Sequence, residues 1–180
     1  MRKRRSRSNP ENASKPALTA DQLRARTFER AAKLLAAKPR SVAELREQLS
    51  ARCSNKAIVE TVIVRLREYG YLDDERYALG YASSKVRQQP MGRRRLQQNL
   101  KLKKVDRAVA EEVLDQVFAE TSEDELIDRA VEKRVRLRGR PKTRAEAKSL
   151  FDHLLRQGFP FELVSDKVRA VSRTELDETE

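Results

Sequence analysis

The stretch from Ser41 to Leu66, SVAELREQLSARCSNKAIVETVIVRL, decides the fold of this chain. Leu45 and Leu49 are one helical turn apart, and Ile58 and Val62 repeat that spacing nine residues further on. Residues four apart lie on one face of an α-helix, so the stretch predicts a helix, a short connection and a second helix that faces the first. Ser41 and Glu44 form a capping-box pattern at the start of the first helix.

The same apolar spacing occurs twice more along the chain. It is repeated by Leu96, Leu100, Val109 and Val113, and again by Phe151, Leu155, Val164 and Val168. Residues 21–37, 74–87 and 123–137 add a further helical stretch ahead of each set. The chain is therefore expected to be all-α, with three tandem three-helix units that stack into an elongated, curved body.

Composition sets the borders of these units. The first unit is expected over residues 21–72, the second over 73–120 and the third over 121–172. Residues 1–20 carry six basic side chains and few large apolar ones, so burial there cannot offset the loss of chain entropy. We expect a disordered basic tail over those residues and an acidic tail over residues 173–180.

Composition also excludes several kinds of site. The 180 residues include one Cys, one His and no Trp, which excludes an internal disulfide and the usual zinc site. No glycine precedes a Lys-Ser or Lys-Thr pair, as a phosphate-binding loop requires. Nothing supplies Cys53 with a partner base, and His153 is expected to be a packed or surface residue of a helix. No apolar run approaches the roughly 18 residues that span a bilayer. We therefore expect a cytoplasmic, monomeric protein that is not an enzyme, uses no cofactor or metal and binds no membrane.

The charge of the chain is basic and striped. Lys and Arg number 40 against 28 Asp and Glu, which gives a net charge of +12. Residues 85–104 hold eight basic side chains and no acidic one, residues 105–132 hold ten acidic and two basic ones, and residues 133–148 hold eight basic ones against Glu146. Such stripes favour an oriented footprint on a polyanion or an acidic protein face, although charged side chains also simply solvate helix surfaces.

The two basic stripes supply the candidate binding residues. On a helix that begins after Gly92, the side chains of Arg94, Gln98 and Lys101 share the face opposite the apolar pair and point to solvent. The predicted footprint consists of Arg93, Arg94, Arg95, Gln98, Lys101, Lys103 and Lys104, and of Arg134, Arg136, Arg138, Arg140, Lys142 and Arg144. Aromatic residues make up 5% of the chain, so base stacking on single strands is poorly supported. DNA contact is expected to be weak, salt-dependent and made through phosphates.

Over about residues 25–170 the chain resembles the RecX family, bacterial regulatory proteins that modulate the RecA recombinase, and four stretches carry the resemblance. They are AAKLLAAKPRSVAELREQL (31–49), LREYGYLDDERYA (66–78), the Gly92 stretch, where Gly92, Arg95, Leu96, Gln98, Leu100 and Lys103 match the family pattern, and LFDHLLRQGF (150–159). The chain departs from the pattern at Asn99, where the family usually has Glu, and at Lys104, where it usually has Gly.

The resemblance implies tandem three-helix units in a curved body that lies in the helical groove of the RecA–DNA filament. There the protein would contact recombinase subunits and inhibit filament growth, ATP hydrolysis and strand exchange, although some family members act differently. These effects would alter DNA repair and recombination.

The residues alone leave two alternatives open. Residues 41–70, followed by YLDDERY (71–77), also read as a helix-turn-helix or winged-helix-like DNA-binding regulator, with a recognition helix over residues 55–68. The other alternative is a general helical nucleic-acid chaperone whose basic tail, residues 1–18, does most of the binding.

Overall fold

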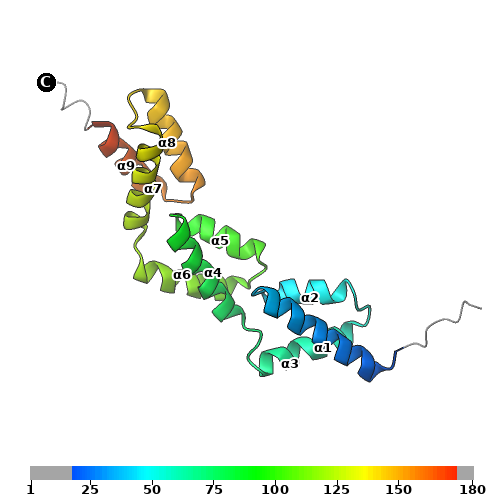
Figure 1. The fold of residues 1–180 in the computed structure, drawn as a ribbon. Helices are drawn as coiled ribbons and strands as arrows, with labels where there is room; N and C mark the ends of the chain where they lie inside the picture. Colours follow the sequence, from blue (N-terminus) through cyan, green and yellow to red (C-terminus); the bar gives the residue numbers. More distant parts are fainter. Residues whose placement is uncertain (1–17, 174–180) are drawn as a thin grey trace, which may run out of the picture.

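The computed structural model describes residues 18–173, which form nine α-helices and no strand. The helices are α1 (Ala20–Ala37), α2 (Val42–Ser50), α3 (Lys56–Glu68), α4 (Asp74–Gln88), α5 (Arg93–Leu102), α6 (Arg107–Glu120), α7 (Glu123–Arg138), α8 (Arg144–Arg156) and α9 (Phe161–Arg173). They form three successive groups of three along an elongated, curved body (Figure 1). The predicted all-α fold of tandem three-helix units is confirmed. The predicted tails fall almost entirely on residues 1–17 and 174–180, outside the described residues.

The helices begin where their capping residues predict. Ser41 and Thr143 each form a full capping box with the glutamate three residues on, and these boxes start α2 and α8. At Ser122 only half of the predicted box forms: the hydroxyl accepts from the Glu125 amide at 3.2 Å. None of the helices in residues 18–173 combines the length and apolar character that a bilayer crossing requires.

The buried side chains form two separate cores. Helices α1–α3 enclose the first, which contains the predicted Leu45, Leu49, Ile58 and Val62. Helices α4–α9 share the second, which runs without a break from the second unit to Phe159 of the third. Apolar contact therefore holds the second and third units together, whereas polar side chains link the first unit to the second.

The third unit departs from the predicted repeat by one residue. Its middle helix buries Leu150 and Leu154, whereas the predicted pair, Phe151 and Leu155, is half-buried and packs against the border of the same core. Successive side chains point about 100° apart around a helix. The pair Leu150 and Leu154 and the pair Phe151 and Leu155 therefore both border the inward-facing side of α8. Phe151 instead lies at the edge of the core, in edge-on contact with Phe161 at 5.3 Å between ring centroids.

Each junction between units repeats one contact. Asp74, the first residue of α4, accepts a hydrogen bond from the amide of Val42, the first residue of α2, at 2.8 Å. Glu123, the first residue of α7, accepts one from the amide of Arg93, the first residue of α5, at 2.6 Å. A helix N-terminus favours negative charge, so in both junctions the following unit caps the middle helix of the preceding one. Asp73 caps α4 itself.

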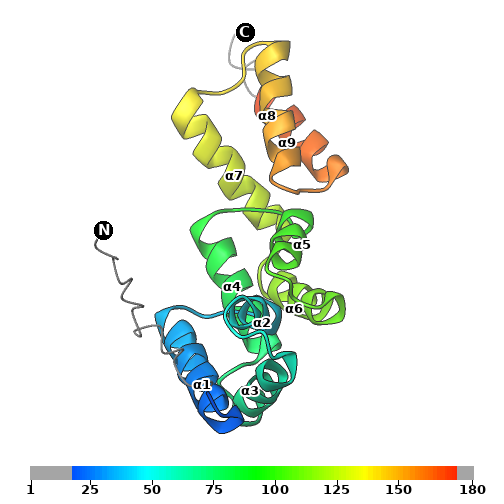
Figure 2. The ribbon, with the colours of Figure 1, turned by 90° about the vertical axis from the view of Figure 1, so that its right-hand side faces the viewer.

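Two glycines allow the second and third units to approach closely. Gly92 lies against the backbone of Gly158, and Gly158, with a φ of +90°, lies against that of Arg95. A Cβ at either glycine would overlap with these atoms. The Gly92 amide also donates to the Gln157 carbonyl at 3.0 Å. The first helices of the three units, α1, α4 and α7, lie one after another along one side of the body (Figure 2).

Candidate partner-binding surface

The exposed face of α5 carries the first part of the predicted footprint. Leu96 and Leu100 are fully buried, and Arg94, Gln98 and Lys101 are exposed on the other side of the helix, as predicted. None of these three forms an ion pair with another described residue. Their polar groups are therefore free to bind a partner.

Arg93 and Arg95, in contrast, contact the protein itself. The Arg93 guanidinium forms ion pairs with Asp115 at 2.7 Å and Glu111 at 3.2 Å, both on α6. Arg95 Nη1 donates to the Gln157 side chain at 2.8 Å and thus connects α5 to the end of α8. These two side chains are half-buried and stabilise the second unit and its junction with the third.

Lys103 and Lys104 contact the first unit. Lys103 Nζ forms an ion pair with Glu44 at 3.3 Å, and Lys104 Nζ forms one with Glu47. The Lys103 carbonyl also accepts a hydrogen bond from the buried Ser41 hydroxyl at 2.6 Å. The structure therefore separates the α5 part of the footprint into exposed residues and residues that join the units.

The second part of the footprint lies at the end of α7 and in the loop that follows. The exposed members are Arg136, Arg138, Arg140, Lys142 and Arg144. Arg134 is half-buried, and its guanidinium donates to the Ser149 hydroxyl at 3.4 Å. Arg134, Arg138 and Arg140 line a cavity of about 220 Å³ between α7 and α8. A concave site with three guanidinium groups has the chemistry that binds phosphate or carboxylate.

The single histidine lies in the middle of the arginine side chains. Burial lowers the pKa of His153 below its ordinary value, and the charges of Arg134, Arg156, Arg95 and Arg138 lower it further. Burial also lowers the pKa of Arg134, with further contributions from Arg138 and Arg156. Like charges this close repel each other, so the cluster raises the local positive potential that an anion would neutralise.

Arg156 joins the two parts of the footprint, and sequence analysis missed it. Its carbonyl accepts from Arg95 Nη1 at 3.2 Å, and its charge acts on Arg134 and His153. It stands outside both basic stripes, which is why a count of charge along the chain did not find it. Its position three residues after His153, on the same face of α8, is the signal that the sequence contained.

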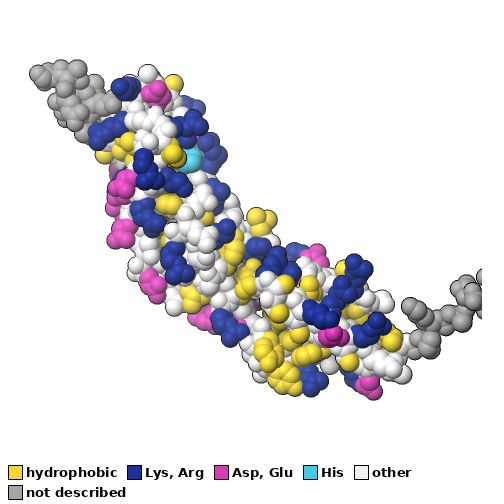
Figure 3. Space-filling model, viewed as in Figure 1, with side chains coloured by type: hydrophobic (Ala, Val, Ile, Leu, Met, Phe, Trp, Pro, Cys, Tyr) yellow, Lys and Arg dark blue, Asp and Glu magenta, His cyan; other side chains and the backbone are white. Residues whose placement is uncertain are grey.

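Charge is unevenly distributed over the surface. Lys and Arg side chains lie on all three units of the face shown in Figure 3, and the histidine, in cyan, lies among them. Acidic side chains follow the outer edge of the second and third units. Cys53 is buried, and no group of three His, Cys, Asp or Glu side chains in residues 18–173 is arranged to hold a metal ion.

Comparisons with known proteins point to one family. Residues 28–66 match the first three-helix domain of RecX, and residues 73–114 match the second. The chain is 38% identical over 109 residues to the regulatory protein RecX of Treponema pallidum, covering 61% of this chain and 66% of that protein. It is 34% identical over 143 residues to that of Halorhodospira halophila, covering 79% and 83%.

The fold agrees with these matches. The crystal structure of RecX from Lactobacillus salivarius superposes with a TM-score of 0.74 at 19% identity, covering 87% of this chain and 99% of that one. Several relatives are longer than this chain: the match covers 58% of the length of RecX from a Geobacillus strain. The all-helical fold, both domain matches and the identity to these proteins place the chain in the RecX family of regulatory proteins.

Proposed function

We propose that this protein binds the RecA recombinase filament in its helical groove and inhibits its ATP hydrolysis, growth and strand exchange. Membership of the RecX family is the observation that carries the proposal. The elongated body of three units supports it, because such a shape suits contact with more than one subunit of a helical polymer. Bound across subunits, the protein would hold conformations that ATP turnover must interconvert. A ligand shifts such an equilibrium only through its different affinity for the two states.

The cationic surface supports a contribution from DNA or an acidic protein face. Arg94 and Lys101 are exposed on α5, and the arginine cluster around His153 continues the positive charge to the third unit. Lysine and arginine that neutralise phosphates release counterions, so DNA binding should weaken steeply as salt is added. We expect the protein to act as a monomer in the cytoplasm.

Recombinase assays test this function directly. Added protein should slow ATP hydrolysis and strand exchange by recombinase on single-stranded DNA. Absence of any effect at a concentration that saturates binding to the filament would overturn the inhibitory mechanism. A variant without residues 1–18 should retain this control, whereas a chaperone that depends on its basic tail would lose all activity.

The structure gives little support to a sequence-specific DNA reader. In the helix-turn-helix interpretation α3 is the recognition helix, yet Glu60 on α3 forms an ion pair with Arg46 at 2.6 Å. Arg65, one of its few cations, lies over the rings of Phe28 and Tyr69. Residues 71–77, the proposed wing, form the connection to α4 and its first turn, with no strand. These contacts, and the helical conformation of residues 74–77, argue against the winged-helix interpretation.

A further inference from the structure

A groove at the junction of the first and second units gathers three of the four tyrosines of the chain. All four tyrosines occur between residues 69 and 81, and Tyr71, Tyr77 and Tyr81 line the groove. Its volume is about 570 Å³, and it lies between the end of α1 and one face of α4. The adjacent face of α4 packs Ala78 and Ala82 into the second core. Tyr77 and Tyr81 border this core with part of their surface and line the groove with the rest.

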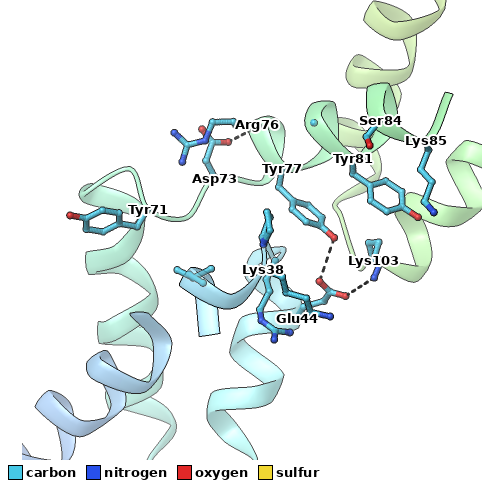
Figure 4. Close-up of a pocket in the computed structure, with 14 residues that line it drawn as sticks. Lys38, Glu44, Tyr71, Asp73, Arg76, Tyr77, Tyr81, Ser84, Lys85 and Lys103 are labelled. Carbon is cyan, nitrogen blue, oxygen red and sulfur yellow. Dashed lines mark hydrogen bonds and ion pairs between the residues drawn. The ribbon is translucent and has the colours of Figure 1, made fainter. Parts of the chain in front are cut away.

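The groove wall is well ordered by internal contacts. The rings of Tyr77 and Tyr81 stack at 6.2 Å, and the Tyr77 hydroxyl donates to Glu44, which also pairs with Lys103 (Figure 4). Burial, together with the charge of Glu44, raises the pKa of Tyr77 to about 12. The hydroxyl thus stays protonated and keeps its hydrogen bond to Glu44. Tyr71, at the other side, is 65% exposed.

The charges around the groove are mainly positive. Its cationic lining residues are Lys38, Arg40, Arg76, Lys85 and Lys103. Its two carboxylates are already engaged: Glu44 accepts from three groups, and Asp73 caps α4. Lys38 is exposed, and the ammonium group of Lys85 lies over the ring of Tyr81, 5.7 Å from its centroid. The positive charge of these side chains favours an anionic ligand, and the tyrosine rings favour one with apolar parts.

We propose that this groove binds an acidic peptide segment of a protein partner, one that places an aliphatic side chain between carboxylates. The aliphatic group would lie against Tyr71, Tyr77 and Leu35, and the carboxylates would pair with Lys38 and Lys85. A nucleic-acid strand fits less well, because the face of Tyr81 is covered by Lys85 and Lys103 and offers a base no place to stack. The proposal does not depend on recombinase as the partner.

Fluorescence anisotropy tests the proposal, with a short labelled peptide of alternating glutamate and leucine as the probe and the full chain as the receptor. The double variant Lys38→Glu, Lys85→Glu should weaken binding about tenfold or more, since two ion pairs become repulsions. The variant Arg52→Glu, Lys56→Glu makes the same change of net charge at exposed residues outside the groove, and it should bind as the wild type does.

A second pair of measurements separates the groove from plain charge attraction. Tyr71→Ser removes an exposed ring, so the fold should remain and binding of the glutamate–leucine peptide should weaken. Binding of a glutamate–serine peptide should be weaker from the start and unaffected by that variant. Equal affinity for the two peptides would overturn the proposal, and so would an affinity for the glutamate–leucine peptide that the groove substitutions leave unchanged. Displacement of that peptide from the groove by an oligothymidylate would also overturn it. Recombinase control can succeed or fail independently of each of these outcomes.

Discussion

Lys104 has a left-handed backbone conformation that glycine would adopt without cost. Its φ is +58°, and it follows α5 where the chain reverses direction. The amide of Val105 returns to the Leu100 carbonyl at 3.2 Å, the bond that defines a Schellman cap. Gly70 and Gly158 occupy the same position after α3 and α8. A side chain in this conformation costs about 1–2 kcal/mol.

Lys104→Gly should therefore raise the free energy of unfolding. We expect a gain on the order of 1 kcal/mol, because relief of the backbone strain exceeds the value of an exposed ion pair with Glu47. Urea denaturation followed by circular dichroism measures it. Lys104→Ala is the control: it loses the same ion pair but keeps the left-handed backbone, so it should gain nothing. A Gly variant no more stable than the Ala variant would show that the position is unstrained.

His153 reports on the arginine cluster, since it is the only histidine of the chain. Its pKa is lowered in the folded state, first by burial and then by the neighbouring arginines. The unfolded chain therefore binds the proton more readily, and stability should fall as the pH drops below about 6.5. His153→Gln should lose this part of the pH dependence, as denaturation at several pH values would show.

Binding of an anion should move the same pKa upward. A phosphate near Arg134 and Arg156 would offset their charge and let the imidazole take up a proton more easily. Proton NMR can follow the single imidazole resonance through a pH titration, with and without a single-stranded oligonucleotide. An unchanged titration curve at saturating oligonucleotide would mean that DNA does not bind at this cluster.

At the scale of the elements, the junction of the second and third units depends on Gly92 and Gly158. Gly92→Ala should destabilise the chain by about 1–3 kcal/mol, since the added methyl group must displace the Gly158 backbone. Gly80→Ala is a matched control, because Gly80 lies within α4 and a Cβ there meets no atom within 4 Å. That variant should stabilise the helix by about 0.5–1 kcal/mol. Equal stability of the two variants would contradict the close packing at this junction.

The helices could be predicted from the sequence because their signals are local. Capping residues and four-residue apolar spacing fix where α2 or α8 begins and which face turns inward. The contacts between units could not be predicted in this way. Asp74 and Glu123 look like ordinary acids in the first turn of a helix, and only the fold brings each to the N-terminus of another helix.

The candidate site was predictable to a similar extent. Charge stripes identified the α5 and α7 residues, and helical spacing identified Arg94 and Lys101 as exposed. The sequence did not show that Arg93 and Arg95 would be used by the protein itself, because their partners lie on α6 and at the end of α8. The sequence did not reveal the tyrosine groove either. A low aromatic content does not indicate whether the few rings lie together in the folded chain.

At the scale of the whole molecule, the two cores divide the body into a separate first unit and a joined second and third unit. The tyrosine groove lies at the polar junction between these parts, and the arginine cluster lies on the joined part. A partner could therefore contact both parts of one elongated molecule. Arg94 and Lys101 lie on the exposed side of α5, in the second unit.

Co-sedimentation with recombinase filaments on single-stranded DNA, at two salt concentrations, tests the central claim most directly. The variant Arg94→Glu, Lys101→Glu should bind much more weakly than the wild type while its unfolding curve stays the same, because both side chains are exposed and unpaired within the described chain. The variant Arg52→Glu, Lys56→Glu, with the same net charge, should still co-sediment. Equal sedimentation of wild type and the Arg94, Lys101 variant at both salt concentrations would contradict the claim that this cationic surface binds the filament.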